Sequence, residues 1–314
     1  MNTANSTPSG ESLPRSIPEY LEQLRHALTG ADPALLQDAL YDAEEYLRSE
    51  LAENPGKSEA EVIAAVASSY GAPEEVADIY RDTEVKVQAA LRPPRPPKQR
   101  SLLGRFFGVV ADPRAYAALF YMLLSLVTGI FYFTWVTTGA ALSLGLAILI
   151  IGIPFVILFF ASVRVLSLVE GRIVEVMLGE RMPRRPVYVD REKSLLSRIG
   201  EMFTDPRTWT TMLYFLLMQP LGTFYFSVAI ILIALSLACV AVPVLVWIGF
   251  GSIDTSGGWP LALFSGDGVT TTLAAWMLPL CLIVGVLLFF LTLHLSRGIG
   301  KVHGLIAKHL LVRA

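Results

Sequence analysis

Charged residues and cysteines are scarce in this sequence of 314 residues. Asp, Glu, Lys and Arg together supply 17% of the chain, whereas hydrophobic residues supply 54%. Because a soluble domain is usually about 25% charged, this composition excludes an ordinary soluble protein. The two cysteines, Cys239 and Cys281, lie inside apolar stretches, which favours packing over a disulfide or a metal pair.

Sequence motifs of common enzymes and metal sites are also missing. The chain has no Walker loop, no His-Glu-x-x-His, no Cys-x-x-Cys and no Gly-x-Ser-x-Gly. His303 and His309 are six residues apart, a spacing that does not put both on one face of a helix. We therefore expect no catalytic residue, no cofactor and no metal site. The polar residues 1–16 lack the basic and then apolar pattern of a cleaved signal peptide.

Three long runs, residues 115–163, 208–250 and 272–296, are nearly free of charge. A membrane-spanning helix needs about 20 apolar residues, so these runs predict an integral membrane protein. Residues 208–250 would form about 65 Å of helix, long enough for two crossings, and that alternative stays open. We favour four crossings in all, at about 115–137, about 140–163, about 220–248 after a shallow interfacial helix that ends at Gln219-Pro220, and within 272–296.

The distribution of charge predicts which side of the membrane each segment faces. Lys and Arg are concentrated in residues 91–114, 164–207 and 297–313, whereas residues 251–271 contain two Asp and neither Lys nor Arg. The positive-inside rule therefore predicts that both termini are cytoplasmic and that about 251–271 is an external insertion. Only His294 is expected as an ionisable side chain within a span, which argues against an ion-coupled carrier.

The membrane region contains an internal repeat. Residues 101–133 recur at 194–226, 93 residues later and without a gap, with 14 of 33 positions identical. Similarity resumes at an offset of 133, where Arg164, Gly171, Ile173 and Leu178 align with Arg297, Gly304, Ile306 and Leu311. We therefore predict a duplicated membrane module, with repeat 1 at residues 101–193 and repeat 2 at 194–314.

Aromatic triplets at equivalent positions of the two repeats are the best candidate ligand site. Tyr132 and Tyr225 lie in spans, where a hydroxyl needs a hydrogen-bond partner. Together with Phe131 and Phe224, they could line a cleft for an amphiphile between the two halves. An interfacial aromatic belt or simple helix packing would explain the same residues.

Two Asp-Pro-Arg motifs and two short amphipathic segments complete the candidate sites. Asp112 and Asp205 precede prolines, which is typical of a helix start, but they could also form an Asp–Arg latch between the halves with Arg114 and Arg207. Residues 101–111 and 194–204 predict helices on the membrane surface. Their lipid-contacting residues would be Arg105 and Arg198.

The polar N-terminal region predicts a separate helical domain. Helix-start signals occur at Ser16, Asp32 and Ser58, with Glu19 and Glu61 placed to complete capping boxes, and Gly71 is placed to end a helix. We expect a disordered N-terminus at 1–14 and a small cytoplasmic bundle at 15–90. The Pro- and Arg-rich residues 91–100 predict a stiff, extended linker.

Both regions resemble known families of bacterial membrane proteins. The elements Asp42-Ala43-Glu44-Glu45-Tyr46 and Tyr70-Gly71-Ala72-Pro73-Glu74-Glu75-Val76-Ala77 resemble the HAAS-type helical signalling domain. Residues 101–314 resemble the sensor domain at the N-terminus of many bacterial sensor histidine kinases, through both Asp-Pro-Arg motifs and Gly152-Ile153-Pro154. The resemblance implies a location in the bacterial cytoplasmic membrane. We expect no kinase in this chain.

The sequence thus predicts an all-α protein: a cytoplasmic helical bundle joined to a duplicated transmembrane helical module with interfacial helices. The function we expect is non-enzymatic signalling from the membrane to a cytoplasmic regulator or sensor-kinase partner. Membrane lipids are further expected partners, a homo-oligomer is allowed, and nucleic acid is not expected. The alternatives are a small transporter or channel, or an accessory subunit of one, and a membrane scaffold that binds anionic lipid.

Overall fold

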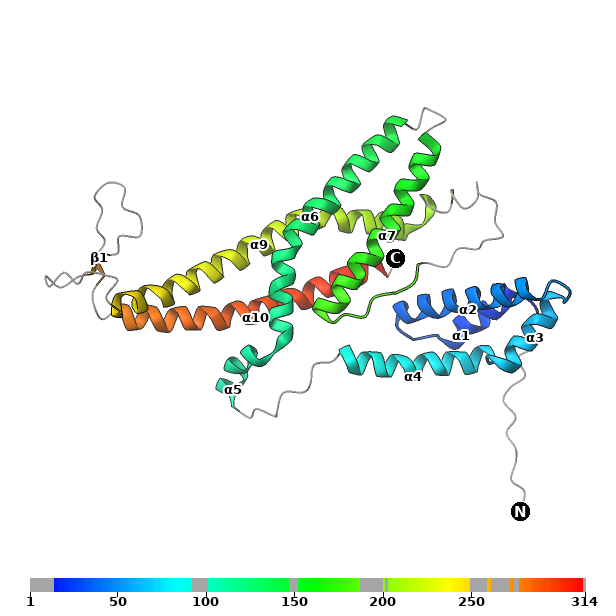
Figure 1. Ribbon diagram of the computed structural model, residues 1–314, viewed down its shortest axis with the longest axis horizontal. Helices are drawn as coiled ribbons and strands as arrows, with labels where there is room; N and C mark the ends of the chain where they lie inside the picture. The colour runs from blue at the N-terminus through cyan, green and yellow to red at the C-terminus, as the bar shows by residue number, and fades with distance from the viewer. Residues whose placement is uncertain are drawn as a thin grey trace, which may run out of the picture.

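The computed structural model describes residues 14–91, 101–146, 152–186, 200, 203–248, 259–260, 272–273 and 277–312. Within these residues the protein is all-α, as predicted from the sequence (Figure 1). The exception is a two-residue antiparallel pair, β1 (Trp259–Pro260) with β2 (Thr272–Leu273). The rest of the predicted external insertion, the Pro-rich linker and the N-terminal tail lie outside the described residues.

The N-terminal domain, called the head below, contains four helices that begin where the capping signals predict. They are α1 (Ile17–Ala27), α2 (Pro33–Glu53), α3 (Glu59–Ser69) and α4 (Pro73–Leu91). The side chains of Ser16, Asp32 and Ser58 each accept a hydrogen bond from the first turn of the following helix. The Ser58–Glu61 capping box is confirmed. The Ser16 box is only half formed, because the Glu19 carboxylate accepts from the Arg15 backbone N–H instead.

The head has its own hydrophobic core. Tyr20 is fully buried at its centre, and its hydroxyl donates to the Gly71 carbonyl over 2.9 Å. Gly71 has a φ of +121°, a conformation that a residue with a Cβ rarely adopts, so glycine suits the turn between α3 and α4. Around Tyr20 pack apolar residues from all four helices: Leu21, Leu24, Leu35, Leu40, Leu47, Ile63, Val66 and Val76.

Among the described residues, four further helices are long and apolar enough to cross a membrane. They are α6 (Pro113–Leu146), α7 (Gly152–Leu178), α9 (Pro206–Trp247) and α10 (Met277–Leu311). A short helix, α5 (Leu102–Phe107), and the 3₁₀ turn η1 (Gly108–Ala111) precede α6. The number of candidate crossings agrees with the four predicted, so the protein is an integral membrane protein.

The predicted boundaries of these helices need correction. The shallow interfacial helix that was expected to end at Gln219-Pro220 is not present, because α9 is continuous through Pro220 and Pro243. A proline removes one backbone hydrogen bond, a loss that neighbouring helices can make tolerable in a membrane helix. The second helix also begins later than predicted, at Gly152, and continues beyond 163 to Leu178. Its last two turns are charged, which is why composition alone ended it too early.

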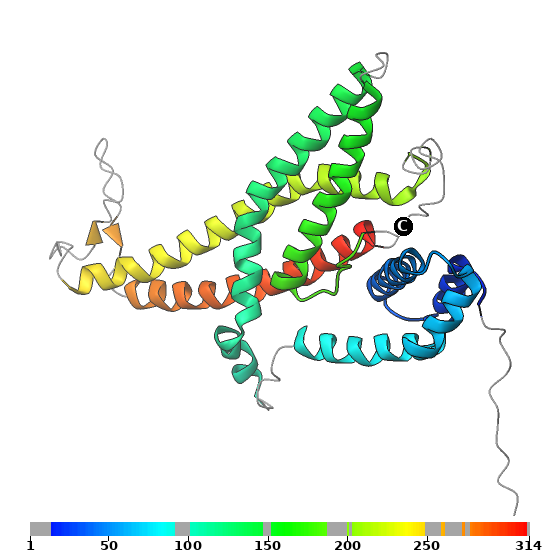
Figure 2. The same cartoon turned by 45° about the vertical axis from the view of Figure 1, so that its right-hand side comes forward.

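The long helices form two pairs that cross each other. In Figures 1 and 2, α6 runs beside α7 and α9 runs beside α10, and the two pairs diverge from a shared crossing point. At the crossing, a Cβ on Gly129 would overlap the Met218 carbonyl, and a Cβ on Gly222 would overlap the Ser125 carbonyl. These two contacts are related by the same 93-residue offset as the sequence repeat, so α6 and α9 cross in an approximately symmetric way.

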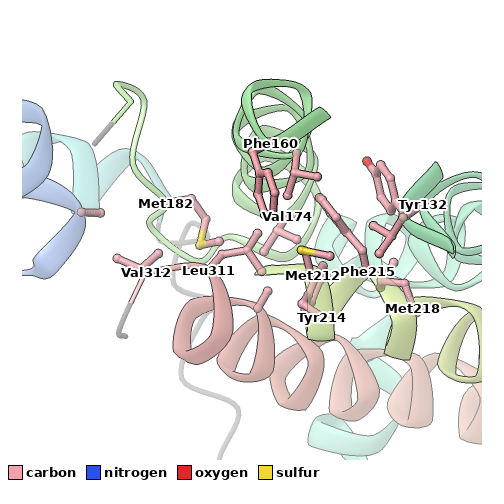
Figure 3. Packing of buried hydrophobic residues seen from close by; sticks show 14 of the residues in the cluster. Tyr132, Phe160, Val174, Met182, Met212, Tyr214, Phe215, Met218, Leu311 and Val312 are labelled. Carbon is pink, nitrogen blue, oxygen red and sulfur yellow. The ribbon is translucent and has the colours of Figure 1, made fainter. Parts of the chain in front are cut away.

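The main core of the membrane part lies on the head side of this crossing. Figure 3 shows Met212, Tyr214 and Phe215 of α9 packed among side chains of α7 and α10. Leu311 at the end of α10 and Met182, just after α7, extend this core toward the head. All four membrane helices therefore meet in one packed region, and that region holds the polar cluster described next.

Candidate functional site

A buried polar cluster lies where the four membrane helices meet, and we call it the tyrosine cluster. Its members are Tyr121 and Tyr132 of α6, Glu170 of α7, Tyr214 and Tyr225 of α9, and His303 of α10. Glu170 and His303 are fully buried, as is Tyr214. Because a buried carboxylate or imidazole is costly unless it is hydrogen-bonded, these contacts stabilise the arrangement.

Glu170 accepts hydrogen bonds from three phenols. The hydroxyls of Tyr121 and Tyr214 both donate to Oε1, over 2.8 and 3.0 Å, and the Tyr132 hydroxyl donates to Oε2 over 3.0 Å. Both carboxyl oxygens are therefore occupied by protein donors. Charge-assisted bonds of this kind are stronger than bonds between neutral groups, so Glu170 ties α6 and α9 to α7.

His303 completes the cluster from the opposite side. Its Nε2 lies 2.7 Å from the Tyr121 hydroxyl and 2.9 Å from the Tyr214 hydroxyl, and its Nδ1 lies 3.4 Å from the Tyr225 hydroxyl. A phenol has one proton, and Tyr121 and Tyr214 use theirs on Glu170. With both phenol protons on Glu170, a proton on His303 Nε2 would be shared between the two phenol oxygens.

The cluster repeats the internal offsets of the sequence. Tyr121 and Tyr214 are 93 positions apart, as are Tyr132 and Tyr225, while Glu170 and His303 are separated by 133, the offset of the second aligned segment. Equivalent positions thus hold a carboxylate in one half and an imidazole in the other. An acid opposite a base across two shared phenols forms a continuous hydrogen-bonded path between the two halves.

The four central residues lie at one level of the bundle. Tyr121 and Tyr214 are eight residues after the first residues of α6 and α9, and Glu170 and His303 are eight residues before the last residues of α7 and α10. Eight residues correspond to about 12 Å of helix. Glu170 and His303 thus join His294 as ionisable side chains on the candidate spanning helices, which was not expected from the sequence.

The Asp-Pro-Arg motifs each perform two tasks in the structure. Asp112 Oδ1 accepts from the Arg114 backbone N–H over 3.1 Å, and Asp205 Oδ1 accepts from the Arg207 backbone N–H over 3.0 Å. These are helix caps, as predicted for a helix start. The second oxygen of each Asp pairs with an arginine of the other half of the molecule.

Asp–Arg pairs do join the two halves, but the arginines differ from those proposed for the latch. Asp112 pairs with Arg297 and Asp205 pairs with Arg164, each over 3.1 Å. Arg164 and Arg297 occupy equivalent positions at the 133-residue offset. Arg114 instead lies against Gly179, and Arg207 donates to Gln37 of the head and to the Val312 carbonyl.

The remaining predicted site residues are dispersed. Tyr132 and Tyr225 both reach the tyrosine cluster, whereas the neighbouring Phe131 and Phe224 are 48% and 58% exposed on the outside of the bundle. The predicted cleft would need all four side chains to face one space, and the structure brings together only the two tyrosines. The side chain of Arg105 and the whole of Arg198 lie outside the described residues, so lipid contact by them stays a prediction.

The head is attached to the membrane helices by a buried ionic contact centred on Arg181. Its guanidinium lies 2.9 Å from Asp38 of α2 and 3.2 Å from Glu84 of α4, and all three side chains are at most 8% exposed. Burial alone would lower the pKa of Arg181, but the hydrogen bonds and charges of Asp38 and Glu84 outweigh burial and raise it. Arg181 therefore stays charged between the two domains.

Other contacts surround Arg181 and belong to the same interface. The backbone N–H groups of Arg184 and Arg185 both donate to Asp38 Oδ1 over 2.8 Å. On the membrane side, the Glu175 carboxylate of α7 accepts a hydrogen bond from the Arg184 guanidinium over 2.9 Å. At the end of α10, Lys308 lies 2.5 Å from Asp32, the residue that caps α2. The head thus contacts segments from both halves of the membrane region.

Sequence reasoning found the two tyrosines of the triplets but missed the other four residues of the cluster. One signal was available: the alignment at an offset of 133 places Glu170 opposite His303. Both residues follow long apolar runs in basic segments, where a charged side chain is ordinarily solvated. Only the packing of α7 and α10 against α6 and α9 shows that they are buried.

Comparison with known proteins identifies the family of the membrane region. Residues 121–311, which include all six members of the tyrosine cluster, match the family described as "Putative sensor". No curated protein and no solved structure matches the chain. Because the match spans more than half of the sequence, the chain belongs to this sensor family.

Proposed function

We propose that this protein is a non-enzymatic sensor of the bacterial cytoplasmic membrane that relays a membrane or envelope signal to a cytoplasmic regulator through its head. Membership of the sensor family supports a sensing role for the membrane helices. The resemblance of residues 15–90 to the HAAS-type domain supports a signalling role for the head. Both termini would then be cytoplasmic, in keeping with the basic residues beside the head.

One observation carries this proposal: the head is held by residues adjoining the helices that form the tyrosine cluster. Glu170 and Glu175 lie on the same helix, and Glu175 contacts Arg184, whose backbone N–H binds Asp38 of the head. In the other half, His303 is followed five residues later by Lys308, which binds Asp32. A rearrangement at Glu170 or His303 would therefore displace groups that hold α2.

The two connections are equivalent in the repeat. Glu175 and Lys308 are 133 positions apart, the same separation as Glu170 and His303. A charged residue five positions after each member of the acid–base pair thus leads from the cluster to the head. Coupling of this kind needs an element with two arrangements, and the phenols shared by Glu170 and His303 are the element that we propose.

Capture of partners from native membranes tests the relay. A photocrosslinking residue replaces exposed Glu75 or Ile79 of the head, or, as a matched membrane control, exposed Ile231 of α9. We expect the head positions to capture a cytoplasmic regulator or a kinase that the α9 position does not capture. If all three positions capture the same membrane-embedded proteins and nothing else, the relay proposal is wrong.

A second candidate function, proton-coupled transport, is favoured by Glu170 and His303. Ionisable residues inside membrane helices often mark proton paths in transporters. Their complete burial under protein donors opposes this function, because neither residue is exposed to a passage in the described part of the chain. Proton flux into vesicles that contain the purified protein decides the question. Flux above that of empty vesicles, lost in Glu170→Gln, would establish transport, and flux equal to that of empty vesicles would exclude it.

A further inference from the structure

A cavity lies where the start of α9 meets α7 and the head. Its volume is about 80 Å³, which is room for several water molecules or one small anion. Part of its lining is apolar and includes Met182 and Leu311, both labelled in Figure 3. Polar side chains from three parts of the chain complete the lining, among them Gln37 of the head, Arg164 of α7, and Asp205, Arg207 and Thr208 at the start of α9.

The charges that line this cavity do not balance. Arg164 and Arg207 contribute two positive charges, and Asp205 contributes one negative charge, the only one among the described residues of the lining. Asp205 pairs with Arg164 over 3.1 Å, and the two side chains are 23% and 25% exposed. One positive charge therefore remains in a partly buried space. Because buried charges in proteins are ordinarily paired, an anion would be stabilised here.

Arg207 is the cation without a counter-charge. Its guanidinium donates to the Gln37 side-chain oxygen over 3.0 Å and to the Val312 carbonyl, and both acceptors are neutral. Among the residues that the structure describes, no carboxylate forms an ion pair with it. A guanidinium has five N–H donors in a planar fork that matches the geometry of phosphate. Donors of Arg207 are therefore left for the oxygen atoms of a ligand.

The equivalent arginine of the first repeat, Arg114, has different surroundings. It lines a separate space together with Glu180, Arg181 and Lys308. Arg181 and Lys308 are already paired with carboxylates of the head, and Glu180 supplies a further negative charge. The protein itself therefore balances the charge around Arg114, which makes this residue a matched control for Arg207.

A buried hydroxyl is a second, independent observation at the same cavity. Thr208 belongs to the lining and is 2% exposed, and its hydroxyl has no hydrogen-bond partner among the described residues. The first repeat has Ala115 at the equivalent position. Because a buried hydroxyl without a partner is unfavourable, a ligand that carries oxygen acceptors would be stabilised beside it.

We propose that this cavity binds a phosphate group, held by the guanidinium groups of Arg207 and Arg164 where the membrane helices meet the head. Two sources carry this group: the headgroup of an anionic phospholipid and dissolved phosphate. Since Arg207 is bonded to Gln37, an occupant would lie one contact away from the head. This inference rests on the proposed function for its meaning as a signal. Binding is measured without any partner protein, so its failure is distinct from a failure of the relay.

Ligand titration of the full-length protein in detergent tests the proposal. Native mass spectrometry measures the retention of phosphatidylglycerol and of phosphatidylcholine with the same acyl chains, and calorimetry measures the binding of inorganic phosphate. Preferential retention of phosphatidylglycerol would identify a lipid headgroup as the ligand, and binding of inorganic phosphate would identify the dissolved anion. Equal retention of the two lipids without binding of inorganic phosphate would overturn the proposal.

Three variants make the test specific to this cavity. Arg207→Gln should lower the affinity about tenfold, because a charge-assisted hydrogen bond is lost. Asp205→Asn should raise the affinity, because it removes the negative charge of the lining while asparagine still caps α9. Arg114→Gln should change the affinity little. Equal losses in Arg207→Gln and Arg114→Gln, or a loss in Asp205→Asn, would contradict the site, and thermal unfolding confirms that each variant is folded.

Discussion

At the scale of single residues, the main finding is that Glu170 and His303 are buried opposite each other and share two phenols. Glu170 takes bonds from three tyrosine hydroxyls, so its loss would leave Tyr121, Tyr132 and Tyr214 with unused donors. The cost of a buried polar group without its partner is much larger than the gain from a typical hydrogen bond. The tyrosine cluster is therefore sensitive to small chemical changes.

The first prediction concerns Glu170 itself. We expect Glu170→Ala to lower the free energy of unfolding by about 3 kcal/mol or more, because three buried donors lose their acceptor. Glu170→Gln keeps one acceptor oxygen and should cost less. The measurement is thermal unfolding of the purified protein in detergent. Val176→Ala, at a 73% exposed position of the same helix, is the control and should change stability little. Equal losses in Glu170→Ala and Val176→Ala would contradict the buried cluster.

A second prediction at this scale concerns the capping box of α3. The Ser58 backbone N–H donates to the Glu61 carboxylate, and this bond holds the pKa of Glu61 below its usual 4.5. A lowered folded pKa means that the stabilisation is fully present above pH 4.5 and is lost as the pH falls through the folded value. Hydrogen exchange at the start of α3 should therefore quicken in that acidic range. In Glu61→Gln the acid-dependent step should be absent, and its persistence there would disprove the assignment.

At the scale of helices, the crossing of α6 and α9 depends on glycines. Gly129 and Gly222 face the carbonyls of Met218 and Ser125 so closely that a Cβ would overlap them. Small residues at such a crossing allow two backbones to approach, which is a common basis of helix packing in membranes. The sequence repeat showed both glycines, but it could not show that each one packs against the other helix.

The third prediction follows from this crossing. Gly129→Ala and Gly222→Ala should each destabilise the protein by about 1–3 kcal/mol, since the added methyl forces the backbones apart. Gly298→Ala is the matched control in α10, because a Cβ there meets nothing within 4 Å. That variant should be neutral or slightly stabilising, by the lower entropy of its unfolded chain. Denaturant or thermal unfolding compares the three, and equal effects at all three positions would refute the crossing geometry.

Sequence patterns predicted helix boundaries well where neighbouring residues determine them. They predicted boundaries less well where tertiary packing determines them. The caps at Ser16, Asp32 and Ser58 depend on neighbouring residues, and they lie where predicted. The end of α7 could not be predicted from composition, because Glu170 is polar and becomes buried only against α6 and α9. The continuity of α9 through Pro220 could not be predicted either, because a proline inside a soluble helix ordinarily ends or kinks it.

At the scale of the whole molecule, the head and the membrane helices are joined through Arg181. Removal of one partner of a buried ion pair strongly destabilises a protein, because the other charge is left buried and unpaired. The fourth prediction is that Arg181→Ala releases the head, so that limited proteolysis cleaves the segment before α5 faster than in the unmodified protein. Arg25→Ala breaks an exposed pair with Glu22 and should leave the cleavage rate unchanged. Equal cleavage rates in Arg181→Ala and in the unmodified protein would contradict the docking role of Arg181.

The overall plan of the molecule was partly visible in the sequence. The repeat and the charge pattern predicted four membrane helices behind a helical head, and the structure has four candidate crossings. What no pattern predicted is that the head contacts both halves, at Arg181 and Lys308, because these residues are far from Asp38 and Asp32 in the chain. Long-range ion pairs of this kind have no local sequence signal.

Hydrogen exchange measures whether the tyrosine cluster and the head are coupled. The full-length protein in lipid vesicles is compared with the Tyr121→Phe, Tyr214→Phe double variant, which removes the two shared phenols at nearly constant volume. We expect faster exchange in the first turns of α2, around Asp38, and unchanged exchange in α3. Unchanged exchange in α2, together with altered exchange in α6 and α9, would show that the cluster and the head are not coupled.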